Sequence, residues 1–249
     1  MWHLDSKHNK ETFRNNYKLY LMEALGLAVF MCSACFFAGQ LWHPGAYLNT
    51  VFSTEISRNL IMGITMGLTA LFIFYSPLTA PSGSHINPAV SMVQLYLGKL
   101  SKFNFVFYVI FQFAGGLVAV YMMSFLMKYT LTDAPVNYVV TVPGMGITEW
   151  KAALYETAIG FIMITVVLNI SNSSLKKFTR ILAACLVCIY VIVAGPVSGF
   201  GMNPARSFAS ALPSGIYTAF WIYIFCPVVG MMAAVILYKK LPLLKMERE

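Results

Sequence analysis

GFGMNPARSF at residues 199–208 places an Asn, a Pro and an Arg together inside a long apolar stretch. GSHINPAVSM at residues 83–92 repeats its central triplet, so that Asn87-Pro88-Ala89 and Asn203-Pro204-Ala205 lie 116 positions apart. Asn is among the best N-cap residues, and Pro is favoured at the first helical position because its missing N–H costs nothing there. Each triplet therefore predicts the start of a helix.

The apolar run after each triplet is too short to cross a bilayer. One run extends from Pro88 to about Leu97 and the other from Pro204 to about Leu212, which makes each about 15 Å long at about 1.5 Å per residue. Two such half-helices entering from opposite faces would meet end to end within a hydrocarbon core of about 30 Å. Their positive N-termini would oppose cations and protons at the midplane, whereas a neutral hydrogen-bonding molecule could pass.

The composition of the chain is that of a membrane protein. Its 249 residues are 59% hydrophobic and 10% charged, which is too few charges to cover a soluble globule of this size. A membrane helix needs about 20 predominantly apolar residues. Six segments qualify: 19–41, 59–80, 104–127, 150–170, 179–196 and 216–238. We therefore expect an all-α membrane protein with six transmembrane helices plus two half-helices.

The net charge of +8 is distributed in a way that argues against nucleic acid as a partner. Of the 17 basic residues, 13 lie in the N-terminal tail, just after the first triplet, at 176–180, or at the C-terminal end. With six spans these four regions share one face, which the positive-inside rule makes cytoplasmic. Both termini are predicted to be cytoplasmic, in a multi-pass protein of the cell (plasma or inner) membrane.

The two triplets also divide the chain into an internal repeat. We expect a cytoplasmic tail at 1–18, a first repeat at 19–127, an extracellular loop at 128–149, a second repeat at 150–238 and a cytoplasmic tail at 239–249. Each repeat holds three spans, and because three is odd the second repeat enters from the opposite side. Such an inverted repeat brings its special segments to a shared midplane.

Two acids, Glu23 and Glu156, are the only ones in the six spans. A carboxylate at membrane depth costs about 2.5 to 3.5 kcal/mol on insertion scales, so each requires a reason. A proton relay would continue through other titratable groups, but apart from Lys151 at the start of the span at 150–170 the spans contain no His, Lys or Asp. We favour a structural clamp, in which each carboxylate accepts backbone N–H groups from a buried loop.

Several rival classes of protein find little support. Cys32/Cys35 and Cys185/Cys188 have CxxC spacing, but they lie in apolar spans, where free Cys behaves as a small hydrophobe. We predict no metal and no cofactor. No catalytic set is evident. An ion-coupled transporter would require a titratable or cation-binding group beside the two Asn residues, and none is evident there. A membrane protein with a closed pore is a further alternative.

The motifs HINPAV and GMNPAR, in two halves that each carry an acid in the first span, resemble those of the aquaporin family of water and glycerol channels, also called major intrinsic proteins. The resemblance extends from about residue 19 to 238, and two triplets with an Arg directly after the second are very specific. It implies a right-handed bundle of six spans and two half-helices, assembled as a homotetramer in the lipid bilayer with one pore per subunit.

The resemblance also implies roles for individual residues. Asn87 and Asn203 become the midplane donors, and His85 matches a loop histidine that braces the loop. Arg206 lines an outer constriction with one loop residue, Phe200, and two residues from the spans. The fifth-span position falls at or near Val191, and the second-span position falls on Met66 or Gly67.

The permeant is predicted from the departures of this chain from the family pattern. The absence of a His near Val191 and the presence of Phe200 resemble glycerol-conducting members. Ser207, Ala211 and Tyr223 resemble the water-channel pattern. We predict a water channel that excludes protons and ions and is not an enzyme, with glycerol or other small neutral solutes as the alternative permeants.

Overall fold

The computed structural model describes residues 6–241, with side chains from residue 9 onward. Residues 1–5 and 242–249, which include most of the predicted tail at 239–249, lie outside the described part of the chain. The described elements are helical: α1 (Ser6–Trp42), α2 (Tyr47–Val51), α3 (Glu55–Tyr75), η1 (Ala80–Ser82), α4 (Pro88–Tyr96), α5 (Lys102–Met127), α6 (Tyr129–Thr132), η2 (Asn137–Val139), α7 (Glu149–Ser171), η3 (Lys176–Phe178), α8 (Thr179–Ser198), α9 (Pro204–Ser214) and α10 (Phe220–Lys240).

Six of these helices are long and apolar enough to cross a membrane, namely α1, α3, α5, α7, α8 and α10. The predicted all-α fold with six spans is therefore confirmed. The first helix begins at Ser6, so most of the predicted tail at 1–18 is a helical extension of the span rather than a separate segment.

The second span also differs from its predicted range of 59–80. It begins at Glu55, because the Thr54 side chain accepts the Ser57 N–H at 3.2 Å and caps the helix. It ends at Tyr75, because Pro77 disfavours helical geometry in the residue before it, and Ser76 is extended with ψ 132°. The segment that leads into α4 consequently starts earlier than the apolar run suggests.

The short helices α4 and α9 begin at Pro88 and Pro204, as the triplets predict. Helix α9 ends two residues later than expected, at Ser214, where Gly215 adopts a left-handed conformation with φ 68°. Neither helix is long enough to span a bilayer.

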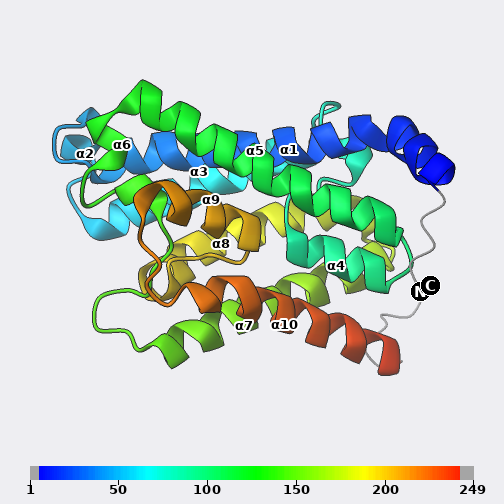
Figure 1. Cartoon of the computed structure of the whole chain (residues 1–249). Helices are drawn as coiled ribbons and strands as arrows, with labels where there is room; N and C mark the ends of the chain where they lie inside the picture. Colours follow the sequence, from blue (N-terminus) through cyan, green and yellow to red (C-terminus); the bar gives the residue numbers. More distant parts are fainter. Residues whose placement is uncertain (1–5, 242–249) are drawn as a thin grey trace.

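Glycines set the separation of the long helices that pack in pairs. A Cβ at Gly115 of α5 would lie 2.1 Å from the Ala24 carbonyl oxygen of α1, and a Cβ at Gly230 of α10 would lie 2.0 Å from the Thr157 carbonyl oxygen of α7. Only glycine permits such an approach of two backbones. The pairs α1–α5 and α7–α10 lie on opposite sides of the bundle (Figure 1).

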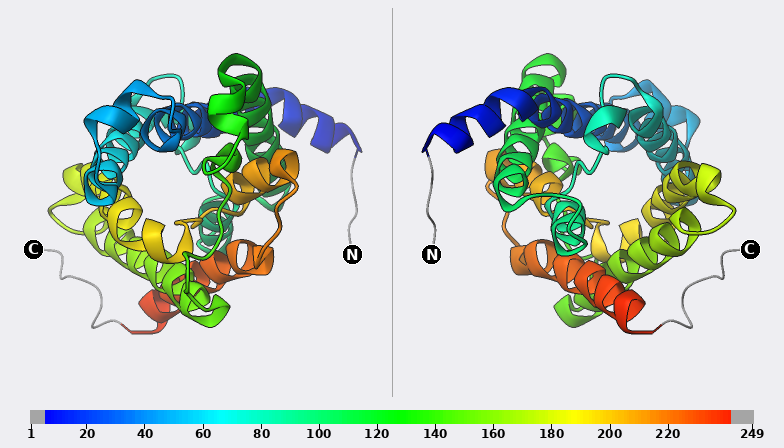
Figure 2. Two further views of the ribbon diagram at one scale, coloured as in Figure 1. Left: turned by 90° about the vertical axis from the view of Figure 1, so that its left-hand side faces the viewer. Right: turned by 90° about the vertical axis from the view of Figure 1, so that its right-hand side faces the viewer.

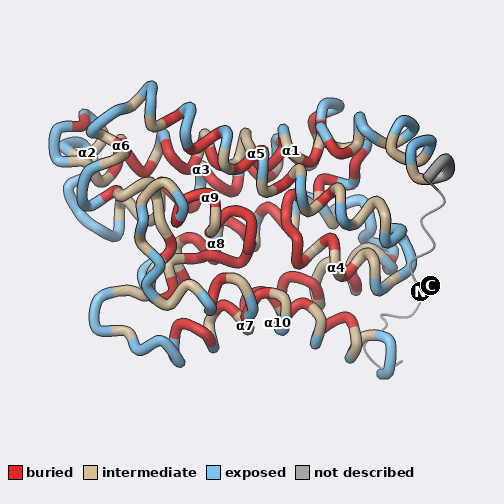
Figure 3. The backbone as a smooth tube through the Cα atoms, viewed as in Figure 1, coloured by how far each residue is buried: buried red, intermediate tan, exposed pale blue. Residues whose placement is uncertain are grey.

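Viewed end-on, the long helices form a ring, and α4 and α9 enter it from opposite ends (Figure 2). We call the end where α1 begins and α10 ends the proximal end, and the end that holds α2 and α6 the distal end (Figure 1). Buried backbone is concentrated in the interior, around α9 and the start of α4 (Figure 3). The functional features predicted from the sequence lie in this interior.

Candidate functional site

The two half-helices begin at capped N-termini in the interior of the bundle. The Asn87 Oδ1 accepts the Ala89 N–H at 2.9 Å, and the Asn203 Oδ1 accepts the Ala205 N–H at 3.0 Å. Both Asn residues are nearly buried, at 4% and 8% exposure. The caps have the form that the two triplets predict, and they leave the amide nitrogens free to bond elsewhere.

Those amide nitrogens join the two repeats. The Asn87 Nδ2 donates to the Met202 carbonyl at 2.8 Å, and the Asn203 Nδ2 donates to the Ile86 carbonyl at 2.7 Å. Each carbonyl belongs to the residue directly before the other Asn. Because an amide nitrogen carries two hydrogens, one N–H of each Asn is left over, and both residues line a cavity described below.

Glu23 lies fully buried on α1 and accepts hydrogen bonds from the loop before α4. Its carboxylate receives the Ser82 hydroxyl at 2.6 Å and the backbone N–H groups of His85 and Ile86 at 2.9 and 2.5 Å. The Gln112 amide of α5 donates to it at 2.8 Å. These bonds have the form that the clamp hypothesis predicts.

Glu156 makes a similar arrangement on α7. Its carboxylate receives the Ser198 hydroxyl at 2.6 Å and the backbone N–H groups of Gly201 and Met202 at 2.9 and 2.6 Å. No side chain of α10 donates to it within the described residues, because Pro227 stands where α5 carries Gln112. The second clamp thus has one donor fewer than the first.

His85 contacts the loop and the half-helix that it precedes. Its Nδ1 bonds to the Ser91 hydroxyl of α4 at 3.1 Å, and its ring centroid lies 5.2 Å from that of Tyr108. The Gln112 amide reaches the same Ser91 hydroxyl at 3.0 Å. These contacts fit a bracing role for His85, although the residue also lines the proximal cavity.

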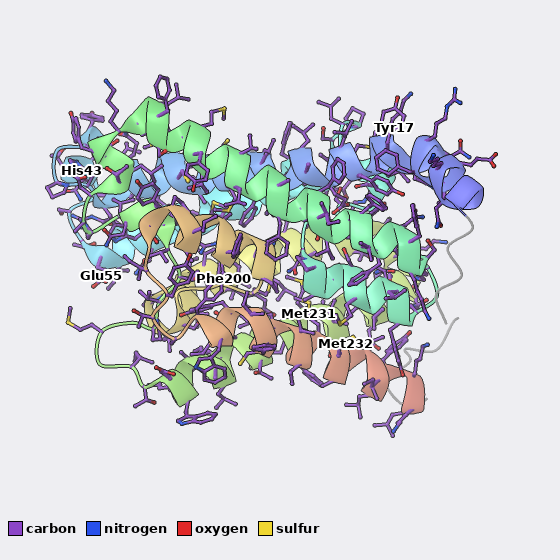
Figure 4. All side chains as sticks on the ribbon, in the orientation of Figure 1. Tyr17, His43, Glu55, Phe200, Met231 and Met232 are labelled. Atoms are coloured by element: carbon purple, nitrogen blue, oxygen red, sulfur yellow. The ribbon has the colours of Figure 1, made fainter. Side chains whose placement is uncertain are left out.

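Two cavities occupy the interior. The proximal cavity has a volume of about 340 Å³, and residues of both repeats line it, including Asn87, Asn203 and His85. The distal cavity has a volume of about 400 Å³ and opens between the ends of α1, α3 and α8 and the segment at 135–145. Figure 4 shows Phe200 in the middle of the bundle, and Glu55, which also lines the distal cavity, at the distal end.

The distal cavity brings together the residues of the predicted constriction. Met66, Val191, Phe200 and Arg206 all line it, and each is at most 8% exposed. The Arg206 Nη1 is buried and has no hydrogen-bond partner among the described residues. The three other side chains offer only apolar surface, so the guanidinium is the polar group of this set.

Met66 and Gly67, the two alternatives for the second-span position, lie on different faces of α3. Met66 lines the distal cavity. A Cβ on Gly67 would lie 2.8 Å from the Cβ of Cys188 and 3.2 Å from the Ala184 carbonyl oxygen, so Gly67 is at the contact between α3 and α8. Hydropathy does not indicate which of the two residues turns inward, because both lie in the same apolar span.

Sequence reasoning missed several residues of the site. Phe30 of α1 lines both cavities, and the segment at 135–145 walls the distal one with Pro, Val and Met residues. It also missed Ser82 and Ser198, although they are 116 positions apart, as the two Asn residues are. Matching the two repeats position by position would have found the serines.

The cysteines form no disulfide bond with one another. All five are free thiols, and Cys35 and Cys226 are buried. Within residues 6–241 no group of three or more His, Cys, Asp or Glu residues is placed to hold a metal ion.

Comparisons with known proteins agree on one family. The family described as major intrinsic protein matches residues 10–238. NIP4-1 of Arabidopsis thaliana is 31% identical over 177 residues, which is 70% of this chain and 60% of that protein. Aquaporin NIP2-2 of Zea mays is 33% identical over 159 residues, 63% of this chain and 52% of that protein. The chain thus aligns with less than two thirds of the length of these relatives.

A solved structure has the same fold. The X-ray structure of the aquaglyceroporin from Plasmodium falciparum superposes with a TM-score of 0.74 and covers 92% of this chain and 98% of that one, at 21% sequence identity. At this identity the likeness concerns the arrangement of the helices alone.

Proposed function

Because the chain belongs to the major intrinsic protein family, whose members are channels and not enzymes, we propose that it conducts water passively across a membrane and excludes protons and ions. The observation that carries the proposal is the junction of α4 and α9. There Asn87 and Asn203 each donate across the repeats and line an interior cavity.

We call the proximal and distal cavities together the lumen. The exclusion of cations follows from positive charge at two depths of this lumen. The N-termini of α4 and α9 each contribute roughly half a positive charge at the junction. Arg206 adds a full charge on the wall of the distal cavity. A cation would have to give up water and pass both, whereas a neutral molecule can accept hydrogen bonds from the Asn amides.

A second candidate function is the passage of glycerol or other small neutral solutes. Among the four residues of the predicted constriction, Arg206 is the one hydrogen-bond donor. The apolar side chains of the other three, Met66, Val191 and Phe200, line the distal cavity with it. Such a wall suits the carbon backbone of a polyol, while Arg206 can serve its hydroxyl groups.

We assign the following roles as part of the proposal. Asn87 and Asn203, with the Pro and Ala residues of their triplets, form the midplane junction. Met66, rather than Gly67, acts with Val191, Phe200 and Arg206 as the selectivity filter, and its place on the cavity wall supports this choice. Glu23, Glu156 and His85 hold the loops in position.

The orientation in the membrane belongs to the same proposal. Ten basic residues of the described chain belong to segments at the proximal end: Lys10, Arg14, Lys18, Lys99, Lys102, Lys176, Lys177, Arg180, Lys239 and Lys240. The distal end has Arg58, Lys128 and Lys151. By the positive-inside rule the proximal end is cytoplasmic, and we expect a homotetramer in the cell membrane.

A stopped-flow assay on proteoliposomes tests the function. Vesicles that contain the protein should shrink faster than protein-free vesicles in sucrose. If glycerol is also a permeant, vesicles shrunk in glycerol should re-swell at a rate that depends on the protein. Shrinkage no faster than in protein-free vesicles would reject the water channel, and the absence of protein-dependent re-swelling would reject glycerol.

A further inference from the structure

The two cavities share very little of their walls. Among the described residues, Phe30 and Phe200 are the two that line both the proximal and the distal cavity. The two side chains therefore stand where the cavities meet. They come from opposite repeats, one from a long helix and the other from the loop before α9.

Phe30 begins a stripe of four residues on the inward face of α1. Ala34, Ala38 and Trp42 follow it at intervals of four and line the distal cavity, so all four residues share the inward face of the helix. The two residues after Phe30 in this stripe are alanines, which leave space. Phe30 is therefore the bulkiest side chain of the stripe before Trp42, and it is the one member of the stripe that lines both cavities.

Phe200 is held by its backbone as well as by packing. Its φ of 48° lies in the left-handed region, which a bulky residue adopts only where the surroundings enforce it. The neighbouring Gly201 N–H is bound by Glu156 at 2.9 Å, and the Tyr190 ring lies 6.3 Å from the Phe200 ring between centroids. The second clamp thus fixes the ring beside the lumen.

Phe30 and Phe200 each have a counterpart in the other repeat, and neither counterpart carries an aromatic ring. Met163 follows Glu156 by seven positions, as Phe30 follows Glu23. Ser84 precedes Asn87 by three positions, as Phe200 precedes Asn203, and it has a matching φ of 47°. Met163 and Ser84 both line the proximal cavity only. The two aromatic rings that stand where the cavities meet are therefore not duplicated by the internal repeat.

We propose that Phe30 and Phe200 form an apolar waist that limits the rate of water passage and the size of the solutes that follow, which makes Phe30 a determinant of specificity. The proposal rests on the channel function proposed above. The phenyl rings have no donor or acceptor, so a water molecule between them loses hydrogen bonds. Apolar constrictions of this kind gate channels by dewetting.

Substitutions of Phe30 that change only its size test the waist. Phe30→Ala removes the ring, Phe30→Met introduces the residue of the other repeat, and Phe30→Trp enlarges the ring. In stopped-flow shrinkage, normalised to the amount of folded protein in the vesicles, we expect Phe30→Ala to raise water permeability about threefold or more. Phe30→Met should give a smaller increase and Phe30→Trp a decrease.

Solute size provides a second measurement. Phe30→Ala should also speed re-swelling in glycerol and admit a four-carbon polyol that the wild type passes more slowly. Phe36→Ala is the matched control, because Phe36 is on the same helix, is 45% exposed and lines neither cavity. Its permeabilities should equal those of the wild type.

The outcomes separate the waist from the channel function. If the wild type conducts water and Phe30→Ala and Phe30→Trp both match it, the waist is wrong and the channel stands. If the wild type is silent and Phe30→Ala conducts, the proposed function of the wild type fails, whereas the waist is supported as a constriction that closes the pore. If the wild type and all Phe30 variants are silent while correctly folded, the channel function fails, and the waist fails with it.

Discussion

The two repeats of this protein solve the same structural problem with different numbers of polar contacts. In the first repeat Glu23 accepts four hydrogen bonds, and His85 and Gln112 both reach the Ser91 hydroxyl. In the second, Glu156 accepts three, and the hydroxyl of Ser207, the counterpart of Ser91, is buried without a partner in the part of the chain that the structure describes. The first loop is thus tied to its surroundings at more points than the second.

The second repeat has fewer of these hydrogen bonds, but it carries side chains that differ in charge and size from their counterparts in the first repeat. Arg206 stands where the first repeat has Val90, and Phe200 stands where it has Ser84. His85 is matched by Gly201, whose hypothetical Cβ would lie 2.5 Å from the Tyr223 ring. The comparison teaches that the duplicated scaffold is preserved through hydrogen bonds between side chains and backbone groups, while side chains facing the lumen are free to diverge.

The largest expected effect concerns the clamps. Glu156→Ala leaves the Gly201 and Met202 N–H groups buried without acceptors, at about 1–3 kcal/mol each, or about 2–6 kcal/mol in total. Glu23→Ala orphans the same number of backbone groups, but its loop keeps the bonds through Ser91 and Ser84. In thermal unfolding in detergent, Glu156→Ala should therefore have a lower unfolding temperature than Glu23→Ala. The reverse ranking would contradict the idea that the first loop is tied more firmly.

Arg206→Val gives the second repeat the side chain of the first. For a unit charge and a cation separated by about 6 Å, the Coulomb energy at an effective dielectric constant of about 20 is about 3 kcal/mol, and removal of the charge lowers the barrier to the cation by about this amount. This corresponds to an increase of about a hundredfold in proton or cation leak. A pH-sensitive dye inside vesicles under a potassium-valinomycin potential measures the leak.

The matched control for that variant is Val90→Ala, which changes the counterpart residue and removes no charge. Its proton leak should stay far below that of Arg206→Val. An unchanged leak in Arg206→Val would show that the guanidinium charge does not act on the lumen.

Helix packing should respond equally in the two repeats. Gly115→Ala and Gly230→Ala each force a methyl group onto a carbonyl oxygen of the facing helix, and overpacking of this kind costs about 1–3 kcal/mol or more. We expect similar losses of thermal stability from the two variants. Gly195→Ala, at a helical position with nothing within 4 Å of the added methyl, is the control and should not destabilise. A large difference between Gly115→Ala and Gly230→Ala would break the symmetry of the scaffold.

The smallest expected effect concerns a pair of serines. Ser91→Ala removes a hydroxyl with two partners and should lower the free energy of unfolding by about 1–2 kcal/mol. Ser207→Ala removes a buried hydroxyl with no partner, so the change should be within about 0.5 kcal/mol or slightly stabilising. Denaturant unfolding of both variants in one detergent measures the difference. Equal losses would mean that Ser207 has a partner in the folded protein.

Much of this arrangement could be predicted because the sequence marks it chemically. The two Asn-Pro pairs are strong helix starts, and an acid in an apolar span requires donors, so the sequence predicts the half-helices and the two buried carboxylates. The predicted span at 59–80 is displaced from the observed helix at Glu55–Tyr75, because hydropathy alone does not detect a cap at Thr54 or the effect of Pro77.

The lining of the lumen was harder to predict for a physical reason. A helix in a membrane is apolar on all sides, so hydropathy does not reveal which side faces the interior. For this reason hydropathy does not single out Phe30, and only the contact of Gly67 with α8 distinguishes Met66 from Gly67. The segment at 135–145 lies outside both repeats, so no counterpart could indicate its place on the distal wall.

The crossed bonds of Asn87 and Asn203 have a consequence for biosynthesis. The acceptor for the first amide is the carbonyl of Met202, and the carbonyl of Ile86 waits for an amide that is translated more than a hundred residues later. While the ribosome is still producing the second half, the first half has no means of completing its centre. The junction of α4 and α9 is therefore among the last parts of the molecule to form. In nascent chains that end after α5, the Asn87 amide and the Ile86 carbonyl must be satisfied by water, lipid or a chaperone instead.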